Sequence, residues 1–216
     1  MKISIYCEGD TERGVKDLLT PVCGDLREKK LGIHIKSHKN NSQLLRKIGK
    51  STENDIINGA PAVFCLIDLY GIHEAFTHEL SHALGTRNWF GMDTQEKVNW
   101  LKTEIPRRCI APEYRAKFHI HISVYEIEAL MFADPNRIAR MLKVNSIGEF
   151  HHPEKINDVN PPAKLLNELF RQHLKRRYGK TTDGVSLLRE LNFDLVYKQC
   201  PNFKIFVDDL GSITPC

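Results

Sequence analysis

AVFCLIDLYG, residues 62–71, is a nearly continuous apolar run that ends in an acid and a glycine. A short apolar run of this kind is typical of a strand that is buried on both faces of a parallel sheet. Two strand patterns precede it, ISIYC at 3–7 and GIHIKSH at 32–38, and a third, KFHIHIS at 117–123, follows it. Helical patterns separate these runs. Strands that alternate with helices predict an α/β fold with a mostly parallel sheet.

The pattern changes after Pro153. The segment NPPAKLLNELFRQHLKRRYGK, residues 160–180, has a helical period, and the chain from there to Leu210 shows no convincing further strand. We therefore predict two parts, an α/β domain over residues 1–150 and a helical C-terminal extension over residues 151–216 that packs on it.

The composition indicates a soluble globular protein, because 41% of the 216 residues are hydrophobic and 27% are charged. The longest apolar run, Ala60–Ile67, is too short to cross a membrane, and Glu8 interrupts the N-terminus before a signal-peptide core could form. The six cysteines are scattered, which favours the reducing cytoplasm. The formal net charge of +4 permits nucleic-acid binding without requiring it.

HELSH, residues 78–82, matches the H-E-x-x-H pattern of zinc peptidases, in which two histidines one helical turn apart bind zinc. At 100° per residue, His78 and His82 fall nearly opposite the apolar stripe of their helix, on the face expected to be exposed. Asn88 stands where one common spacing would place a third histidine, and a distant ligand such as Glu104 lacks support. A zinc metallopeptidase is therefore the weaker interpretation.

Two segments carry the tail of a phosphate-binding loop, IGKST at 48–52 and YGKTT at 178–182. In each, a leucine replaces the first glycine, Leu44 in one and Leu174 in the other, and neither follows an apolar strand. We interpret neither as a nucleotide site.

Acidic side chains follow three of the predicted strands. Glu8 follows ISIYC with Glu12 one helical turn later, Asp68 ends AVFCLI, and HIHISVY precedes Glu126 and Glu128. Strand alternation would send Glu126 and Glu128 to the same face if the strand persisted that far. Because the carboxyl ends of parallel strands meet at one edge of a sheet, we expect the three clusters to converge there. Clustered carboxylates favour a cation, and Mg²⁺ and Mn²⁺ prefer oxygen ligands.

The motifs EGDTE, LIDLYG and YEIEALMFADP, with the later KIND, PPAK and CPNF, resemble a bacterial family of small Toprim-like proteins. This family is similar to the Toprim domain of the overcoming-lysogenization-defect (OLD) nucleases, and the resemblance covers most of the chain. It implies a four-stranded, mostly parallel sheet flanked by helices, with acids at the strand ends that bind Mg²⁺ or Mn²⁺. A helical C-terminal appendage completes the expected fold.

Residue by residue, the resemblance implies that five carboxylates are metal ligands, namely Glu8, Glu12, Asp68, Glu126 and Glu128. Glu8 is also the candidate catalytic residue. A lysine assists in OLD-like sites, and Lys180 is the candidate here, with Lys164 as the reserve. Many Toprim domains have a second aspartate two residues after the position of Asp68, where this chain has Tyr70, which leaves the choice between one and two ions open.

The resemblance therefore implies a metal-dependent nuclease or nucleic-acid-processing protein of the cytoplasm. Relatives are often encoded beside ABC- or SMC-like ATPases, so an ATPase partner and a role in phage defence are expected, and a homo-oligomer stays open. A non-enzymatic binding module with a weakened site is the alternative. Phosphate contacts are expected from basic side chains, namely Arg107, Arg108, Lys164, Arg176 and Arg177.

Overall fold

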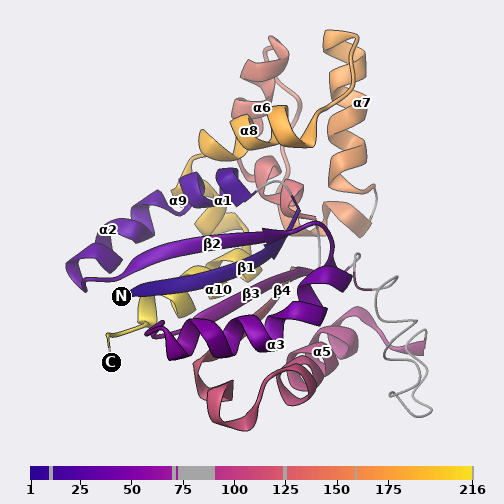
Figure 1. Ribbon diagram of the computed structural model, residues 1–216. Coiled ribbons are helices and arrows are strands. Elements are labelled where there is room, and N and C mark those ends of the chain that lie inside the picture. Colours follow the sequence, from indigo (N-terminus) through magenta and orange to yellow (C-terminus); the bar gives the residue numbers. More distant parts are fainter. Residues whose placement is uncertain (10–11, 70–71, 73–90, 124–125, 159, 216) are drawn as a thin grey trace. The chain divides into compact units, whose positions relative to one another are not determined.

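The computed structural model describes residues 1–9, 12–69, 72, 91–123, 126–158 and 160–215 (Figure 1). Strands alternate with helices over the first half of the chain. The strands are β1 (Lys2–Glu8), β2 (Gly32–His38), β3 (Val63–Asp68) and β4 (Phe118–Ser123). The helices up to β4 are α1 (Glu12–Leu18), α2 (Thr20–Glu28), α3 (Asn41–Ile57), α5 (Thr94–Cys109) and the 3-10 helix η2 (Pro112–Lys117).

The chain that follows β4 is helical. Its elements are η3 (Ile127–Ala133), α6 (Pro135–Leu142), η4 (Pro153–Asp158), α7 (Pro162–Leu174), η5 (Lys180–Gly184), α8 (Val185–Arg189), α9 (Phe193–Gln199) and α10 (Pro201–Ser212). Within the described residues, no strand follows Ser123, which confirms the predicted C-terminal helices.

The four strands form one parallel sheet in the order β2-β1-β3-β4. In the register of β1 with β2, Glu8 lies opposite His38. In the register of β1 with β3, Cys7 lies opposite Leu66. All strands run the same way, so their carboxyl ends lie at one edge of the sheet. The predicted fold class is confirmed, and the sheet is parallel throughout rather than mostly parallel.

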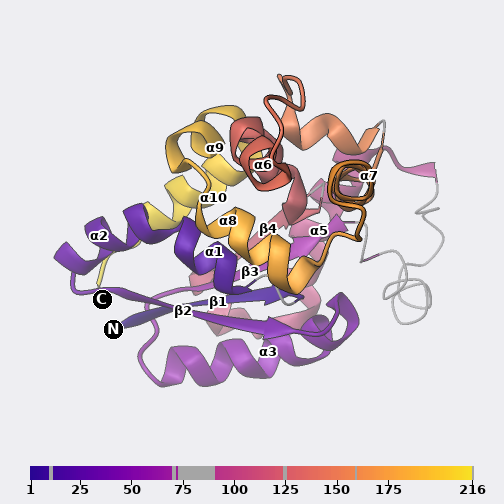
Figure 2. The same ribbon diagram turned by 90° about the horizontal axis from the view of Figure 1, so that it is seen from above.

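One face of the sheet packs against α3 and α5 (Figures 1 and 2). Val63, Cys65 and Ile67 alternate along β3 and are almost fully buried. They share a core with Leu44 and Ile48, which lie one helical turn apart on α3. Each fully buried aliphatic side chain stabilises the fold by roughly 1.5–3 kcal/mol before the entropy of ordering it is counted.

Local capping fixes where these helices begin. The side chain of Asn40 accepts a hydrogen bond from the backbone N–H of Gln43 at the start of α3. At α5, Asp93 accepts from the N–H of Glu96 at 2.8 Å, and the Glu96 carboxylate accepts from the N–H of Asp93 at 3.0 Å. This capping box satisfies donors that have no partner within the helix.

The chain divides into two compact units that interleave in sequence. Unit 1 comprises residues 1–9, 29–124 and 213–216, and unit 2 comprises residues 10–28 and 125–212. The sheet with α3 and α5 belongs to unit 1. In unit 2, α1 packs against α8. The expected boundary between folding domains near residue 150 stays a prediction.

The condition for placing Glu126 and Glu128 on one face of a strand, that the strand extends to them, is not met. β4 ends at Ser123, and η3 begins at Ile127. The six residues from Glu128 to Ala133 are all buried. A run that is buried on every side fits a helical turn packed among other helices, whereas a strand that alternates one apolar and one polar side does not bury every residue.

The remaining sequence motifs have plain outcomes. IGKST lies inside α3 and therefore forms no phosphate-binding loop. The segment HELSH lies outside the described residues. Across the described part of the chain, every helix is too short or too polar to span a bilayer.

Candidate functional site

Unit 2 brings two of the predicted carboxylates to the predicted lysine. The ammonium nitrogen of Lys180 lies 3.2 Å from Glu128 Oε1 and 3.8 Å from Glu126 Oε1. The side chain of Glu128 is 2% exposed and that of Glu126 is 24% exposed, whereas Lys180 is 53% exposed. We call these three residues the acid–lysine group. The Lys180 ammonium is therefore open to solvent, whereas the Glu128 carboxylate is not.

Glu126 is held by the start of α7. Its Oε2 atom accepts a hydrogen bond of 2.9 Å from the backbone N–H of Ala163. Pro161 and Pro162 precede this residue and have no N–H, so Ala163 carries the first donor of the helix. A carboxylate at this end is also favoured by the helix dipole. The interaction leaves Oε1 of Glu126 on the side of Lys180.

Burial controls the electrostatics of the group. It raises the pKa of Glu128, and the neighbouring Lys180 opposes that rise. Burial also raises the pKa of Tyr178 far above its ordinary value, and the negative charges of Glu128 and Asp183 add to the effect. Tyr178 therefore keeps its proton at neutral pH. Its hydroxyl lies 3.8 Å from the sulfur of Met131.

The acid–lysine group has the donor chemistry of a magnesium or manganese site. Lys180 places a positive charge between two carboxylates, which is where a metal cation would be attracted. Mg²⁺ in enzymes is commonly held by one or two carboxylates, with water and substrate phosphate completing its shell. Among the residues with described side chains, no three His, Cys, Asp or Glu gather in a way that could hold a metal. Glu126 and Glu128 are the two carboxylates that face Lys180 there.

Unit 1 contains two more of the predicted metal ligands. Glu8 and Asp68 are the last residues of the neighbouring strands β1 and β3, at the same edge of the sheet. Because Cys7 lies opposite Leu66, alternation places Glu8 on the face of α3 and Asp68 on the other face. The two acids share an edge, as expected, but not a face.

The end of β3 is fixed by a buried side chain that sequence analysis missed. Asn41, at the start of α3, is 1% exposed and donates from Nδ2 to the carbonyl oxygen of Asp68 at 2.9 Å. The contact holds the backbone of Asp68 in place. A buried amide directly after the helix cap was a weak signal, because asparagine is usual near helix starts.

Some predicted residues fall outside the described part of the chain. Glu12 begins α1 in unit 2, and its side chain is not among those described. Tyr70, His78 and His82 lie outside the described residues. The zinc interpretation therefore stays a prediction.

The predicted basic contacts differ in their surroundings. Arg107 and Arg108 at the end of α5 both pair with Glu104, at 2.5 and 2.7 Å. Arg176 donates to both carboxylate oxygens of Asp183, at 2.6 and 2.9 Å. Glu104 therefore offsets part of the positive charge of Arg107 and Arg108, and Asp183 offsets that of Arg176. The remaining two predicted residues, Lys164 and Arg177, are exposed on the surface of unit 2.

Comparisons with known proteins identify a matching family model and a distant structural similarity. A family model described as "Domain of unknown function (DUF4276)" matches residues 7–211. Structures of the C-terminal region of the OLD protein from Xanthomonas campestris pv. campestris align with a TM-score of 0.42 at 14% identity, over 95% of this chain and 96% of that chain. A second structure of the same region gives 0.41 at 16% identity, over 95% and 93% of the two chains. No curated protein matches.

Proposed function

We propose that this chain, which belongs to the family described as domain of unknown function DUF4276, is a divalent-metal-dependent phosphodiesterase that cleaves nucleic acid. The observation that carries the proposal is the acid–lysine group, in which a carboxylate that is 2% exposed faces a half-exposed lysine. Burying a carboxylate is costly, and such groups cluster at functional sites. The sequence motifs that resemble Toprim domains support the same activity.

In this proposal Glu126 and Glu128 hold Mg²⁺ or Mn²⁺ in unit 2. Glu8, Glu12 and Asp68 stay candidate metal ligands on the family resemblance alone. The ion would supply a water of lowered pKa and would stabilise charge on the phosphate. Lys180 is exposed enough to turn from the carboxylates to a phosphate oxygen.

The other chain residues then have defined tasks. Glu8, at the end of β1, is proposed as metal ligand or general base. Lys164 and Arg177, both exposed, are proposed to contact the phosphate backbone, with weaker contributions from Arg107, Arg108 and Arg176 because each is paired with an acid. We further propose, from the family resemblance, that an ABC- or SMC-like ATPase acts with this protein in phage defence.

Cleavage of supercoiled plasmid, single-stranded DNA and single-stranded RNA in Mg²⁺ or Mn²⁺ tests the proposal. We expect Glu126→Gln and Glu8→Gln to lower the rate at least about 100-fold, since each removes a charged group that acts on the reacting atoms. Glu149→Gln is the matched control in unit 2, because the side chain of Glu149 is 83% exposed. It should cleave as the wild type does.

Other outcomes would point elsewhere. Full activity in both Glu8→Gln and Glu126→Gln would contradict the proposal. If cleavage occurred with zinc and only His78→Ala abolished it, the result would favour the zinc site at HELSH. Binding of nucleic acid without cleavage by the wild type, unchanged in Glu8→Gln, would favour the binding module.

A further inference from the structure

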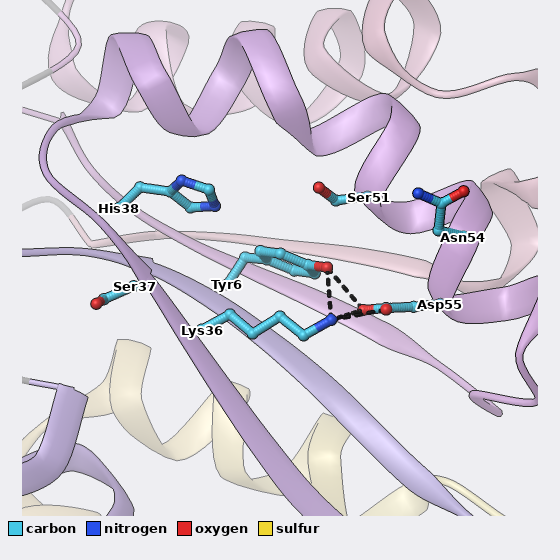
Figure 3. Close-up of a pocket in the computed structure, with 7 residues that line it drawn as sticks. All are labelled: Tyr6, Lys36, Ser37, His38, Ser51, Asn54 and Asp55. Atoms are coloured by element: carbon cyan, nitrogen blue, oxygen red, sulfur yellow. Dashed lines mark hydrogen bonds and ion pairs between the residues drawn. The ribbon is translucent and has the colours of Figure 1, made fainter.

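Unit 1 contains a polar recess that the proposed activity does not use. It has a volume of about 260 Å³ and lies beside β2 and α3 (Figure 3). We call it the β2–α3 recess. Its lining residues are Tyr6 from β1, Lys36, Ser37 and His38 from β2, and Ser51, Asn54 and Asp55 from α3.

One wall of the recess is a self-contained group of three side chains. The Lys36 ammonium donates to Asp55 Oδ1 at 2.7 Å, to Asp55 Oδ2 at 2.8 Å and to the Tyr6 hydroxyl at 3.0 Å. The Tyr6 hydroxyl in turn donates to Asp55 Oδ2 at 2.7 Å. The lysine lowers the pKa of Asp55 despite its partial burial. The carboxylate is therefore neutralised and does not repel an anion in the recess.

The other side chains of the recess are hydrogen-bond donors. Ser51 and Asn54 extend from α3, across from His38 on β2 (Figure 3). Burial lowers the pKa of His38, and the positive charge of Lys47 adds to it, so the imidazole is neutral at pH 7. Among the described residues, Nε2 of His38 is buried and has no hydrogen-bond partner. An imidazole N–H can donate to a ligand oxygen.

Two lysines of α3 flank residues that line the recess. Lys47 and Lys50 are exposed on α3, and each lies four residues before a lining residue, Ser51 and Asn54 respectively. Residues four apart share a helix face. At 100° per residue, the acid Glu53 lies about 120° round the helix from Lys47 but only about 60° from Lys50, so it offsets part of the charge of Lys50 alone. With Asp55 paired to Lys36, the face of α3 that borders the recess keeps a surplus of positive charge.

We propose that the β2–α3 recess binds a phosphate group. Lysine, serine and asparagine side chains are the usual contacts to phosphate oxygens. Ser51 and Asn54 line the recess beside a neutral histidine, and Lys47 and Lys50 lie one helical turn from them on α3. A phosphodiester of a single strand and the phosphate of a small molecule share this chemistry. The site is distinct from the acid–lysine group of unit 2 and needs no metal, so it stands whether or not the protein is a nuclease.

The test measures binding by the full chain in the presence of a chelator, so that metal-dependent binding at the acidic residues does not contribute. The two probes are inorganic pyrophosphate, followed by calorimetry, and a fluorescent single-stranded thymidine oligonucleotide, followed by anisotropy. We expect Lys47→Gln and the double variant Ser51→Ala with Asn54→Ala to weaken binding about tenfold, the loss of one charge-assisted hydrogen bond or of two neutral ones. Lys102→Gln is the matched control, an exposed lysine of unit 1 on α5.

The two probes identify the source of the phosphate. Weakening for the oligonucleotide alone assigns the recess to a nucleic-acid backbone, and weakening for pyrophosphate alone assigns it to a small phosphorylated ligand. If both probes bind the recess variants as tightly as they bind Lys102→Gln, or if neither probe binds the wild type, the proposal is wrong. Far-ultraviolet circular dichroism of each variant checks that the fold is retained.

Discussion

The buried charge of Glu128 lowers the stability of the fold, whereas the proposed metal site requires that charge. The Glu128 side chain is 2% exposed, whereas its ion-pair partner Lys180 is 53% exposed. A carboxylate in this position loses most of its hydration and regains little from a cation that solvent screens. A protein selected for stability alone would place an uncharged side chain here. The arrangement is the expected signature of a site that needs the charge.

We predict that Glu128→Gln stabilises the protein at pH 7 by on the order of 1 kcal/mol, because it removes a buried charge at nearly constant volume. The pKa of Glu128 is raised in the folded state, mainly by burial. The folded protein therefore binds this proton more tightly than the unfolded chain does. Wild-type stability should fall as pH rises through the folded pKa, and denaturant unfolding at several pH values measures it.

The same experiment contains its own control. At a pH low enough to protonate Glu128 in both the folded and the unfolded state, the wild type and Glu128→Gln both carry a neutral side chain at this position. The difference between their free energies of unfolding should therefore shrink toward zero. Glu149→Gln, at an exposed position, should show little difference at any pH. A Glu128→Gln protein that is less stable than wild type at pH 7 would mean that the pair with Lys180 outweighs the cost of burial.

At the scale of elements, the approach of α3 to the end of α5 depends on one glycine. A Cβ atom built on Gly49 would lie 2.1 Å from the carbonyl oxygen of Cys109. That oxygen belongs to the backbone, so the clash cannot be relieved by turning a side chain. The residue that the sequence analysis met in a false phosphate-binding motif thus has a packing role.

We predict that Gly49→Ala destabilises unit 1 by about 1–3 kcal/mol, since overpacking exceeds the gain of up to about 1 kcal/mol in helix propensity. Gly24→Ala in α2 is the matched substitution, because nothing lies within 4 Å of a Cβ built there. It should be neutral or stabilising. The urea concentrations at the unfolding midpoints of the two variants test this prediction. Equal midpoints would show that α3 and α5 can move apart without a loss of stability.

At the scale of the whole molecule, the chain order does not follow the compact units. Unit 2 takes α1 and α2 from near the N-terminus and combines them with the helices after β4. Gly14 of α1 lies so close to α8 that an added Cβ would be 2.7 Å from Leu188 Cβ. The Arg189 guanidinium also donates to Asp17 of α1 at 2.7 Å.

We therefore predict that a fragment ending at residue 150 leaves α1 and α2 without their packing partners. In such a fragment the two helices should be cut by a protease at concentrations that leave the full chain intact. The strands of unit 1 provide the internal reference, because α3 and α5 remain present to cover them. A fragment in which α1 and α2 resist cleavage as they do in the full chain would instead support a folding domain over residues 1–150.

Several features could be predicted from the sequence because their causes are local. The apolar run of AVFCLID identifies a strand buried on both faces, and its spacing from the neighbouring runs predicts a parallel sheet. The motif EGDTE places Glu8 at a strand end. The helical period after Pro153 predicts the C-terminal helices. Each of these follows from residues within one element and its neighbours, so composition and period alone determine them.

Other features depended on contacts between distant segments. Lys180 meets Glu126 and Glu128 only because η5 returns to η3, and the burial that raises the pKa of Glu128 comes from the packed helices of unit 2. Strand register, which no single segment carries, places Glu8 and Asp68 on opposite faces of the sheet. The sequence by itself determined the elements and the residue types of the site. Tertiary packing decided which of those residues meet and how strongly their charges are desolvated, because solvent exclusion and long-range contacts exist only in the folded chain.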